Sequence, residues 1–381
     1  MKPIVSVIVP TKNRYKYLKR LIALVASFSD EEVELVVQDN SDDNSEILDF
    51  LNEHEYKHVK YFYSNDVMSM SQNADLAVRN SIGDYVCFIG DDDAVCRNIG
   101  DCARWMKSEN IDVLRSLYLQ YSWGEKPDGS VNGTLLYDSK IGSYYQVLNP
   151  IKELINILKE GVPDFRDVPK FYHGIISRAI VEKLQALGGT CFPGVTPDMS
   201  SAVSICFLSE KYVTVNIPVV IPGMSKMVGG GVMGKVLSLE EVTFITKKDI
   251  DSWEKGFPRL WATELIWPDC AMKALSYVNH DDYKKYFNKN RMLSRLVAVH
   301  RDYFNEAYNY ADGKIAFLVE FIRYFIVEGC SFWWRKKVLT RITGKKDGKY
   351  YKRKGFHDIL EAESFLMSLI NDCTFSQLKK N

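Results

Sequence analysis

Short apolar segments alternate with longer segments of helical periodicity over the first 120 residues, and this alternation constrains the fold most strongly. The apolar segments predict strands at residues 4–9, 33–37, 59–63, 85–89 and 111–117. The segments between them predict helices at residues 15–28, 43–51 and 71–80, because apolar side chains recur there every three or four positions. Strands separated by single helices form βαβ units, so we expect an α/β fold with a mainly parallel central sheet flanked by helices.

The rest of the chain differs in pattern. Residues 118–235 mix turn signals with short strand and helix patterns, and hairpin-like strands are expected at 118–137. Residues 236–381 are mostly helical in pattern and rich in Trp, Tyr and Phe. We therefore expect an α/β domain at 1–235, divided near residue 117, followed by a helical C-terminal region at 236–381.

Composition excludes several classes of protein. The chain is 46% apolar and 26% charged, as in a soluble globular protein, and its 49 basic residues equal its 49 acidic residues, so no net charge indicates nucleic acid as a partner. The eight cysteines form no CxxC pair, which favours a reducing cytoplasm. The apolar run at residues 4–9 ends at Pro10 without a small-residue cleavage site, so it predicts a strand and not a signal peptide. No run of about 18 apolar residues predicts a membrane span.

Polar side chains gather where the predicted strands end. Residues 10–14 follow the first strand, residues 39–43 follow the second, and Asn73 begins the helix before the fourth. Asp91, Asp92 and Asp93, which we call the aspartate triplet, come directly after the fourth strand. The carboxyl ends of parallel strands meet at one edge of a sheet, where open α/β sheets bind ligands. We therefore expect the four polar clusters to converge.

The aspartate triplet is the most informative of these clusters. Crowded carboxylates repel each other unless a cation lies among them, and hard oxygen ligands favour Mg²⁺ or Mn²⁺ with substrate phosphates completing the shell. The alternative is that these acids form a turn or cap the next helix. The chain has neither a G-x-G-x-x-G loop nor a Walker A sequence, so carboxylates with a metal are the main remaining way to hold a nucleotide.

Together, the four clusters resemble the ordered motifs of family-two glycosyltransferases with the GT-A fold. Residues 5–14 resemble the opening segment of that family, and residues 39–43 resemble its second motif. Asn73 and the segment 83–93 resemble the third motif, which ends in the metal-binding DXD element. The resemblance covers about residues 3–115. It implies a nucleotide-binding half at 1–117 and an acceptor half at 118–235.

The resemblance also implies roles for individual residues. Asp39 would bond the nucleotide base, Thr11 and Arg14 would line the nucleotide pocket, and Asp91 would face the ribose or the metal. The implied nucleotide-sugar site comprises Pro10, Thr11, Asn13, Arg14, Asp39, Asn73, Asp91 and Asp92. The implied cofactor is Mn²⁺ or Mg²⁺, held by Asp91, Asp92 and Asp93. Gly90 stands where many members carry an Asp, so the register of the DXD element stays open by one residue.

Asp198 is the candidate general base. Transfer of a sugar to a hydroxyl group requires a second carboxylate that accepts the hydroxyl proton. Asp198 follows Pro193, Gly194 and Pro197 and precedes an apolar helix, where position alone indicates an ordinary N-cap. The family places its acceptor-activating acid in a similar loop, and that resemblance favours Asp198 as the catalytic residue. The weaker rivals are Asp164, Asp167 and Asp269.

Three further residues are assigned to the acceptor side or to a lid. His173 lies among aromatic residues, which favours a core or rim position, with contact to the acceptor as the alternative. Ser225 and Lys226 precede the glycines 229–231, and this segment predicts either a lid that closes over the donor or a plain mobile loop.

The C-terminal region has two interpretations. Residues 317–326 are apolar and aromatic, and ten Lys or Arg but one Asp lie between Arg335 and Lys354. Aromatic residues beside a basic run favour contact with an anionic membrane surface. The alternative is that the aromatic residues form a helical core and the basic run is a solvated face, and this interpretation is slightly favoured.

The resemblance to family-two glycosyltransferases implies a metal-dependent, inverting glycosyltransferase of surface polysaccharide or O-antigen assembly. It would take a nucleotide-sugar donor and a glycan or lipid-linked saccharide acceptor in the cytoplasm, with peripheral contact to the inner membrane face as a further expectation. The alternative is a non-catalytic, membrane-associated nucleotide-sugar-binding or scaffold protein on the same fold. A nucleotidyltransferase is disfavoured, because no glycine-rich loop follows the first strand.

Overall fold

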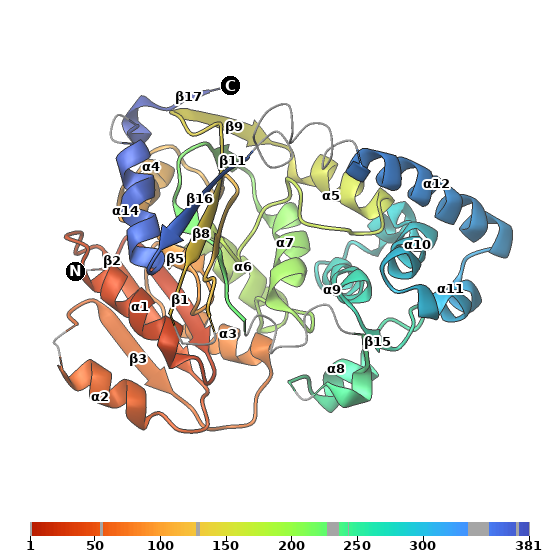
Figure 1. The fold of residues 1–381 in the computed structure, drawn as a ribbon, viewed down its shortest axis with the longest axis horizontal. Coiled ribbons are helices and arrows are strands. Elements are labelled where there is room, and N and C mark those ends of the chain that lie inside the picture. Colours follow the sequence, from red (N-terminus) through yellow and green to blue (C-terminus); the bar gives the residue numbers. More distant parts are fainter. Residues whose placement is uncertain are drawn as a thin grey trace.

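The computed structural model describes residues 2–53, 56–126, 130–226, 236–242, 244–333, 350–370 and 373–380, without the side chains of 328–333. An α/β half contains the sheet and a helical half lies beside it, as Figure 1 shows. The main sheet has nine strands in the order β17-β9-β11-β6-β10-β4-β1-β2-β3. Their bounds are β1 Val5–Thr11, β2 Val33–Asp39, β3 Val59–Tyr63, β4 Tyr85–Phe88, β6 Val113–Ser116, β9 Tyr144–Leu148, β10 Gly174–Ser177, β11 Tyr212–Val215 and β17 Lys379–Lys380.

The predicted mainly parallel sheet is confirmed. Strand β1 pairs in parallel with β2 and β4, and β2 pairs in parallel with β3. Strand β10 lies antiparallel between β4 and β6, which the sequence did not predict. This insertion matters for the site, because it brings the segment just before β10 beside the end of β4.

Helices cover both faces of the sheet. The helices of this half are α1 Tyr15–Ala26, α2 Ser45–Glu53, α3 Met70–Arg79, α4 Ile99–Ser108, α5 Pro150–Lys159, α6 Arg178–Gly188 and α7 Pro197–Leu208. On one face, Val7 of β1 packs in a core with α1 and α4, and on the other face Ile8 packs with α3 and α6. A strand that is covered on both faces needs apolar side chains at successive positions, which explains the apolar run of β1.

A smaller four-stranded sheet lies against the main one. It has the order β13-β7-β8-β16, with β7 Leu119–Ser122, β8 Gly133–Asp138, β13 Gly223–Met224 and β16 Tyr350–Phe356. The antiparallel pairing of β7 with β8 confirms the predicted hairpin strands at 118–137. A two-stranded ladder joins β5 Ala94–Val95, directly after the aspartate triplet, to β12 Val220–Ile221.

The end of the chain returns to the α/β half. Strand β16 pairs with β8, and helix α14 (Ile359–Leu369) packs in a core with residues of α1. Glu363 of α14 is fully buried and accepts two hydrogen bonds from the Arg97 guanidinium, at 3.0 and 2.7 Å. The last residues therefore help to hold the first half of the chain together.

The helical half packs directly on two helices of the α/β half. It contains α8 Lys247–Asp251, α9 Thr263–Tyr277, α10 Lys289–Val299, α11 Phe304–Tyr310 and α12 Lys314–Trp333, with a short ladder of β14 Leu237–Ser238 and β15 Leu260–Trp261. Its core includes Leu154 of α5 and Val203 of α7, so the two halves share one hydrophobic core. In the part of the chain that the structure describes, no helix is both long and apolar enough to cross a membrane.

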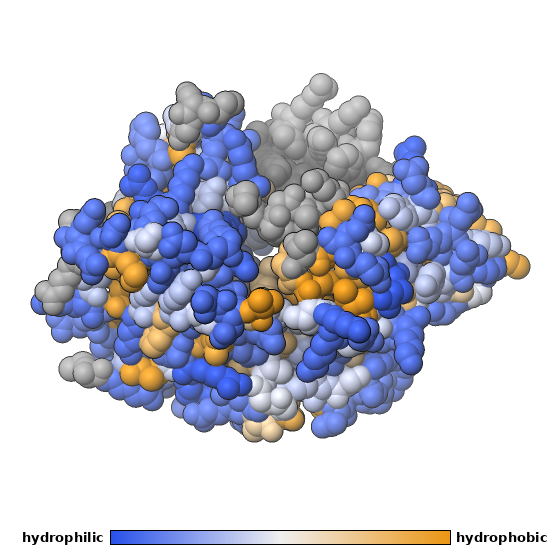
Figure 2. Space-filling view, turned by 90° about the horizontal axis from the view of Figure 1, so that it is seen from below, coloured by the Kyte–Doolittle hydropathy of each residue, from blue (hydrophilic) through white to orange (hydrophobic). Residues whose placement is uncertain are grey.

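Apolar residues also gather between the two halves on the outside. Figure 2 shows them around the middle of the face seen from below, with smaller apolar patches on both halves and hydrophilic residues over most of the remaining surface. Any ligand that is bound along this junction would meet apolar surface at the middle of the face.

Candidate active site

The carboxyl ends of β1, β2 and β4 place three of the four predicted clusters together. Thr11 at the end of β1 lies opposite Asp39 at the end of β2, and the aspartate triplet follows β4, the other neighbour of β1. Asn73, in the first turn of α3, is buried and donates from its amide to the Thr11 carbonyl at 3.2 Å. The predicted convergence of these motifs at one edge of the sheet is therefore present in the structure.

Arg14 bridges two carboxylates of the triplet. Its Nη2 lies 2.7 Å from Asp92 Oδ2, and its Nε lies 3.0 Å from Asp91 Oδ1. Thr11 Oγ1 donates to the other oxygen of Asp91 at 2.7 Å. The guanidinium also stacks over the Tyr17 ring at 5.3 Å from its centroid. One cation thus serves two buried acids.

The surroundings of Asp91 and Asp92 do not fully compensate their charge. Burial raises the pKa of Asp91 to about 7, against the attraction of Arg14, and the neighbouring Asp92 adds to the rise. Burial and repulsion by Asp93 likewise raise the pKa of Asp92. In the described structure, Asp91 Oδ1 and Arg14 Nε are both buried atoms without a hydrogen-bond partner, although they face each other. The pair retains an unmet need for positive charge.

Asp93 is held differently from its two neighbours. Its Oδ2 accepts from the Gly90 N–H at 2.6 Å and from Tyr172 Oη at 3.0 Å, and it lies 2.7 Å from His173 Nε2. Burial alone would raise the pKa of Asp93, but His173 and the backbone donors outweigh burial and lower it. His173 has a left-handed backbone, with φ of 63°, just before β10. The structure therefore brings His173 to the triplet, where its imidazole pairs with the Asp93 carboxylate.

The first part of the predicted lid lies on the triplet. The Gly223 N–H donates to Asp93 Oδ1 at 2.6 Å, and the Ser225 N–H donates to Asp92 Oδ2 at 3.2 Å. Ser225 Oγ accepts from Arg14 Nη2 at 2.8 Å. A Cβ atom at Gly223 would stand 1.7 Å from the Asp92 carbonyl oxygen, so only glycine fits there. The glycines 229–231 of the predicted lid lie outside the described residues.

Lys226 is exposed, and the contact that it makes is through its backbone N–H, which donates to Glu125 at 3.4 Å. Ser225 contacts Arg14 and Asp92, whereas the described structure records no contact of the Lys226 side chain with the aspartate triplet.

Asp39 forms one wall beside the triplet. Its Oδ2 accepts from the hydroxyls of Tyr15 and Tyr61, each at 2.7 Å, and its Oδ1 accepts from the Ser41 N–H at 2.8 Å. Burial and the contact with Asp39 raise the pKa of both tyrosines, which therefore stay protonated as donors.

Asn13 connects the loops that follow β1 and β2. It has a left-handed backbone, with φ of 57°, and its N–H donates to Ser41 Oγ at 2.7 Å. Its side-chain amide donates to Asp42 at 2.8 Å. Pro10, within β1, is half-buried at the same edge. The two loops are thereby fixed relative to each other.

A divalent cation fits Asp91 and Asp92 better than Asp93. Asp91 Oδ1 pairs with Arg14 Nε at 3.0 Å but accepts no hydrogen bond, so with Asp92 it offers the carboxylate oxygens that Mg²⁺ or Mn²⁺ prefers, whereas both oxygens of Asp93 already accept hydrogen bonds from protein donors. Across the described ranges, no group of three or more Asp, Glu, His or Cys side chains is arranged to hold a metal. A site of one or two carboxylates that relies on substrate phosphates is what Mg²⁺ commonly uses.

Asp198 lies in the first turn of α7, half-buried. Its Oδ1 accepts from the Met199 N–H at 2.7 Å and its Oδ2 from Trp267 Nε1 at 3.2 Å. The loop before it is tied to α3 through a hydrogen bond from Ser71 Oγ to the Gly194 carbonyl at 2.8 Å. Asp198 thus belongs to the side of the sheet that α3 and α7 cover.

The three rival acids have other surroundings. Asp164 and Asp167 are exposed and pair with Arg166 and Arg115, respectively, at 3.3 Å each. Asp269 is fully buried inside α9, where its carboxylate lies 2.8 Å from Lys273 Nζ and burial raises its pKa to about 6. Asp269 is therefore the buried partner of Lys273 inside the helical core.

Sequence reasoning missed several residues of the site. Tyr15, Tyr61 and Tyr172 hold the acids, while Trp267 and Lys170 surround Asp198. None of the five belongs to a motif, and each reaches its acid through folding of distant segments. No signal in a single sequence distinguishes such tyrosines from ordinary core aromatics.

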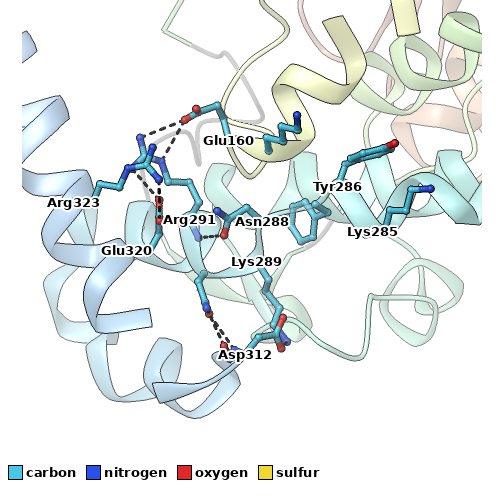
Figure 3. A pocket seen from close by; sticks show the side chains of 12 residues that line it. Glu160, Lys285, Tyr286, Asn288, Lys289, Arg291, Asp312, Glu320 and Arg323 are labelled. Atoms are coloured by element: carbon cyan, nitrogen blue, oxygen red, sulfur yellow. Dashed lines mark hydrogen bonds and ion pairs between the residues drawn. The ribbon is translucent and has the colours of Figure 1, made fainter. Parts of the chain in front are cut away.

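A separate pocket of about 520 Å³ lies in the helical half. Figure 3 shows Arg291 between Glu160 and Glu320, to which it lies at 3.3 and 3.1 Å. Lys289 pairs with Asp312 on the opposite side. These ion pairs connect α10 to the end of α5 and to α12, so the pocket is a junction of helices apart from the triplet.

The segment that forms the donor side of this site matches a known sequence family. Residues 6–158 match the sequence model of the family described as Glycosyl transferase family 2. No curated protein matches the chain.

Solved structures resemble the chain at low identity. They include S. aureus TarS 1-349 in complex with UDP, at 17% identity over 59% of this chain and 61% of that chain, with a TM-score of 0.41. They also include the same fragment with UDP-GlcNAc, at 13% identity over 81% of this chain and 89% of that one, with a TM-score of 0.46. The mannosyltransferase PcManGT from Pyrobaculum calidifontis, in complex with GDP-Man and Mn2+, matches at 14% identity over 97% and 87%, with a TM-score of 0.42. The chain thus spans about three fifths of the first of these structures.

Proposed function

We propose that the chain, whose residues 6–158 match the model of Glycosyl transferase family 2, transfers a sugar from a nucleotide-sugar donor to a hydroxyl group of a glycan or lipid-linked saccharide, with inversion at the anomeric carbon. The observation that carries the proposal is the pair of buried, undercompensated carboxylates Asp91 and Asp92 at the carboxyl edge of the sheet. This is the edge at which α/β sheets bind their ligands. A divalent cation that also binds the donor diphosphate would supply the positive charge that this pair lacks.

The donor half of the proposal assigns roles to residues around the triplet. Asp91 and Asp92 would hold Mn²⁺ or Mg²⁺, which when bound neutralises the charge of the departing diphosphate. Arg14 lies beside both acids and is a cation that can face the same phosphates. Asp39, fixed by Tyr15 and Tyr61, forms the wall against which the nucleotide base would lie.

The acceptor half rests on Asp198. A carboxylate that lies half-buried at a helix start can accept the proton of the acceptor hydroxyl as the hydroxyl oxygen attacks the anomeric carbon. The bond to the diphosphate breaks on the opposite face of the sugar, which gives inversion. The proton moves to the Asp198 carboxylate, and the electron pair of the broken bond leaves with the diphosphate.

Peripheral contact with an anionic membrane is a further part of the proposal. Along α12, Ile315, Val319, Ile322 and Ile326 form one stripe and are 79%, 61%, 58% and 60% exposed. Phe317 of the same helix is buried in the helical core, so the helix has two apolar faces, of which one is unpartnered in the described structure. Ten of the residues from 335 to 354 are Lys or Arg, and those on β16, 352–354, are exposed. Most of this basic run, 335–349, lies outside the described residues.

An apolar stripe followed by basic residues has the chemistry of a surface that rests on anionic lipid. Such contact would suit an enzyme whose acceptor is lipid-linked.

A thermal-shift screen tests the proposed function. Nucleoside diphosphates with different bases are added with and without Mn²⁺, and we expect one or two of them to raise the unfolding temperature only in the presence of the metal. The identity of the stabilising diphosphate names the base of the donor. If no diphosphate raises the unfolding temperature under either condition, the proposal is wrong.

A further inference from the structure

The carboxylate of Asp198 is held by a residue from the helical half, outside the segment that matches the family. Trp267 lies on α9, and its Nε1 donates to Asp198 Oδ2 at 3.2 Å. We infer that Trp267 is a positioning residue, which fixes the orientation of the Asp198 carboxylate for removal of the acceptor proton. The inference rests on the proposed function, because it presupposes that Asp198 is the base.

The Trp267 ring is itself fixed by its neighbours. Helix α9 packs along α7, and the indole meets the Phe165 ring edge to face at 5.0 Å between centroids. The Lys170 ammonium in turn lies over the Phe165 ring, 4.9 Å from the ring centroid. An indole N–H can only donate, so it interacts favourably with the ionised carboxylate and cannot accept its proton. A second donor, the Met199 N–H, occupies the other oxygen, and together the two set the plane of the carboxylate.

The segment that supplies Phe165 and Lys170 has an unusual backbone. Between α5 and β10, Val162, Arg166 and His173 all adopt a left-handed backbone, with φ of 55°, 34° and 63°. Non-glycine residues in this region carry strain, and they cluster in binding and catalytic sites. His173 at the end of the segment contacts Asp93, while Lys170 lies near Asp198. One strained segment therefore reaches both the triplet and the candidate base.

Lys170 is the cation among the groups that face Asp198. Burial, together with repulsion from Arg115 of β6, lowers the pKa of Lys170 to about 8, against the attraction of Asp198, Asp164 and Asp167. Another titratable neighbour is Cys270 of α9, whose pKa burial raises to about 12. Below about pH 8, a protonated Lys170 and a neutral Cys270 thus face the carboxylate. Lys170 and the Trp267 N–H both present positive charge or a hydrogen-bond donor to the Asp198 carboxylate.

Replacing Trp267 with phenylalanine tests the inference. The change removes the N–H and keeps an aromatic ring, and Trp253→Phe is the matched control, because Trp253 Nε1 donates to the Pro258 carbonyl at 3.0 Å in the same half of the molecule. In Trp267→Phe we expect kcat at neutral pH to fall about tenfold and the acid limb of its pH profile to move up by about one pH unit. The KM of the donor should not change. In Trp253→Phe the pH profile should match the unmodified protein.

Two further variants keep the outcome interpretable. Lys170→Gln should move the acid limb in the same direction, which provides a test even if Trp267→Phe does not fold. Asp198→Asn separates the inference from the proposed function. If Asp198→Asn turns over normally, Asp198 is not the base, and both the inference and the role of Asp198 are overturned while sugar transfer itself stands. If Asp198→Asn is inactive while Trp267→Phe and Lys170→Gln keep the original pH profile, the proposed function stands and the positioning role is wrong.

Discussion

At the scale of single residues, three consecutive aspartates have separate roles. Asp91 and Asp92 share the guanidinium of Arg14, whereas Asp93 is committed to His173, Tyr172 and two backbone N–H groups. Adjacent residues on an irregular turn point in different directions, so a run of identical side chains need not act as one group. The sequence indicates acids at this edge, and the fold decides which of them face a ligand.

The raised pKa of Asp91 predicts how the metal-free protein responds to pH. Its folded-state pKa of about 7 lies above the unfolded value of about 3.9, so the folded protein binds the proton more tightly. The free energy of unfolding should therefore fall as the pH rises from about 4 to about 7. Denaturant titrations in the presence of a chelator measure this slope.

Asp91→Asn should flatten the slope between about pH 4 and about pH 7, because it removes the group that titrates. Asp49→Asn is the control, since Asp49 is an exposed acid on α2. An unchanged slope in Asp91→Asn would show that another group is responsible.

At the scale of elements, the stripe on α12 predicts binding to lipid. The double variant Val319→Glu with Ile322→Glu places two charges in the centre of the exposed stripe. Sedimentation with vesicles of mixed neutral and anionic phospholipid should show at least a tenfold loss of binding, since charged side chains cannot enter the interface without a large cost. Ile82→Glu, at a half-exposed position of the α/β half, should bind as the unmodified protein does. Equal binding by all three proteins contradicts the assignment.

The elements that the sequence predicted well are those with a strong local pattern. Strand β1 and helix α1 follow the predicted periodicity within two residues, because a doubly covered strand and an amphipathic helix have patterns that depend on nearby residues only. The convergence of Thr11, Asp39 and the triplet followed from the parallel arrangement of their strands. Local pattern and sheet topology were sufficient for this part of the site.

The elements that the sequence did not predict join distant segments. Strand β10 enters the sheet antiparallel between β4 and β6, and this pairing carries Tyr172 and His173 to Asp93. Trp267 and Asp198 are 69 positions apart in the chain, and they meet because α9 packs on α7. Contacts of this kind depend on tertiary packing, and no periodicity or motif in one sequence encodes them.

At the scale of the whole molecule, the two halves depend on each other. Helices α5 and α7 supply side chains to the core of the helical half, and β16 and α14 return to cover the α/β half. A fragment of residues 1–235 would expose the inner faces of α5 and α7 and would lack β16. We expect this fragment to aggregate or to unfold without a cooperative transition, as followed by circular dichroism. A soluble fragment with a sharp transition would show instead that the boundary near residue 235 separates independent domains.

The central claim is that Asp91 and Asp92 form a metal-dependent nucleotide site. Calorimetric titration with the nucleoside diphosphate that stabilises the protein, with and without Mn²⁺, tests it most directly. We predict saturable binding only with the metal, lost in Asp92→Ala and retained in Asp198→Asn, whose carboxylate acts on the acceptor. Binding of equal strength in the unmodified protein and in Asp92→Ala, or equal binding without any divalent cation, would contradict the claim.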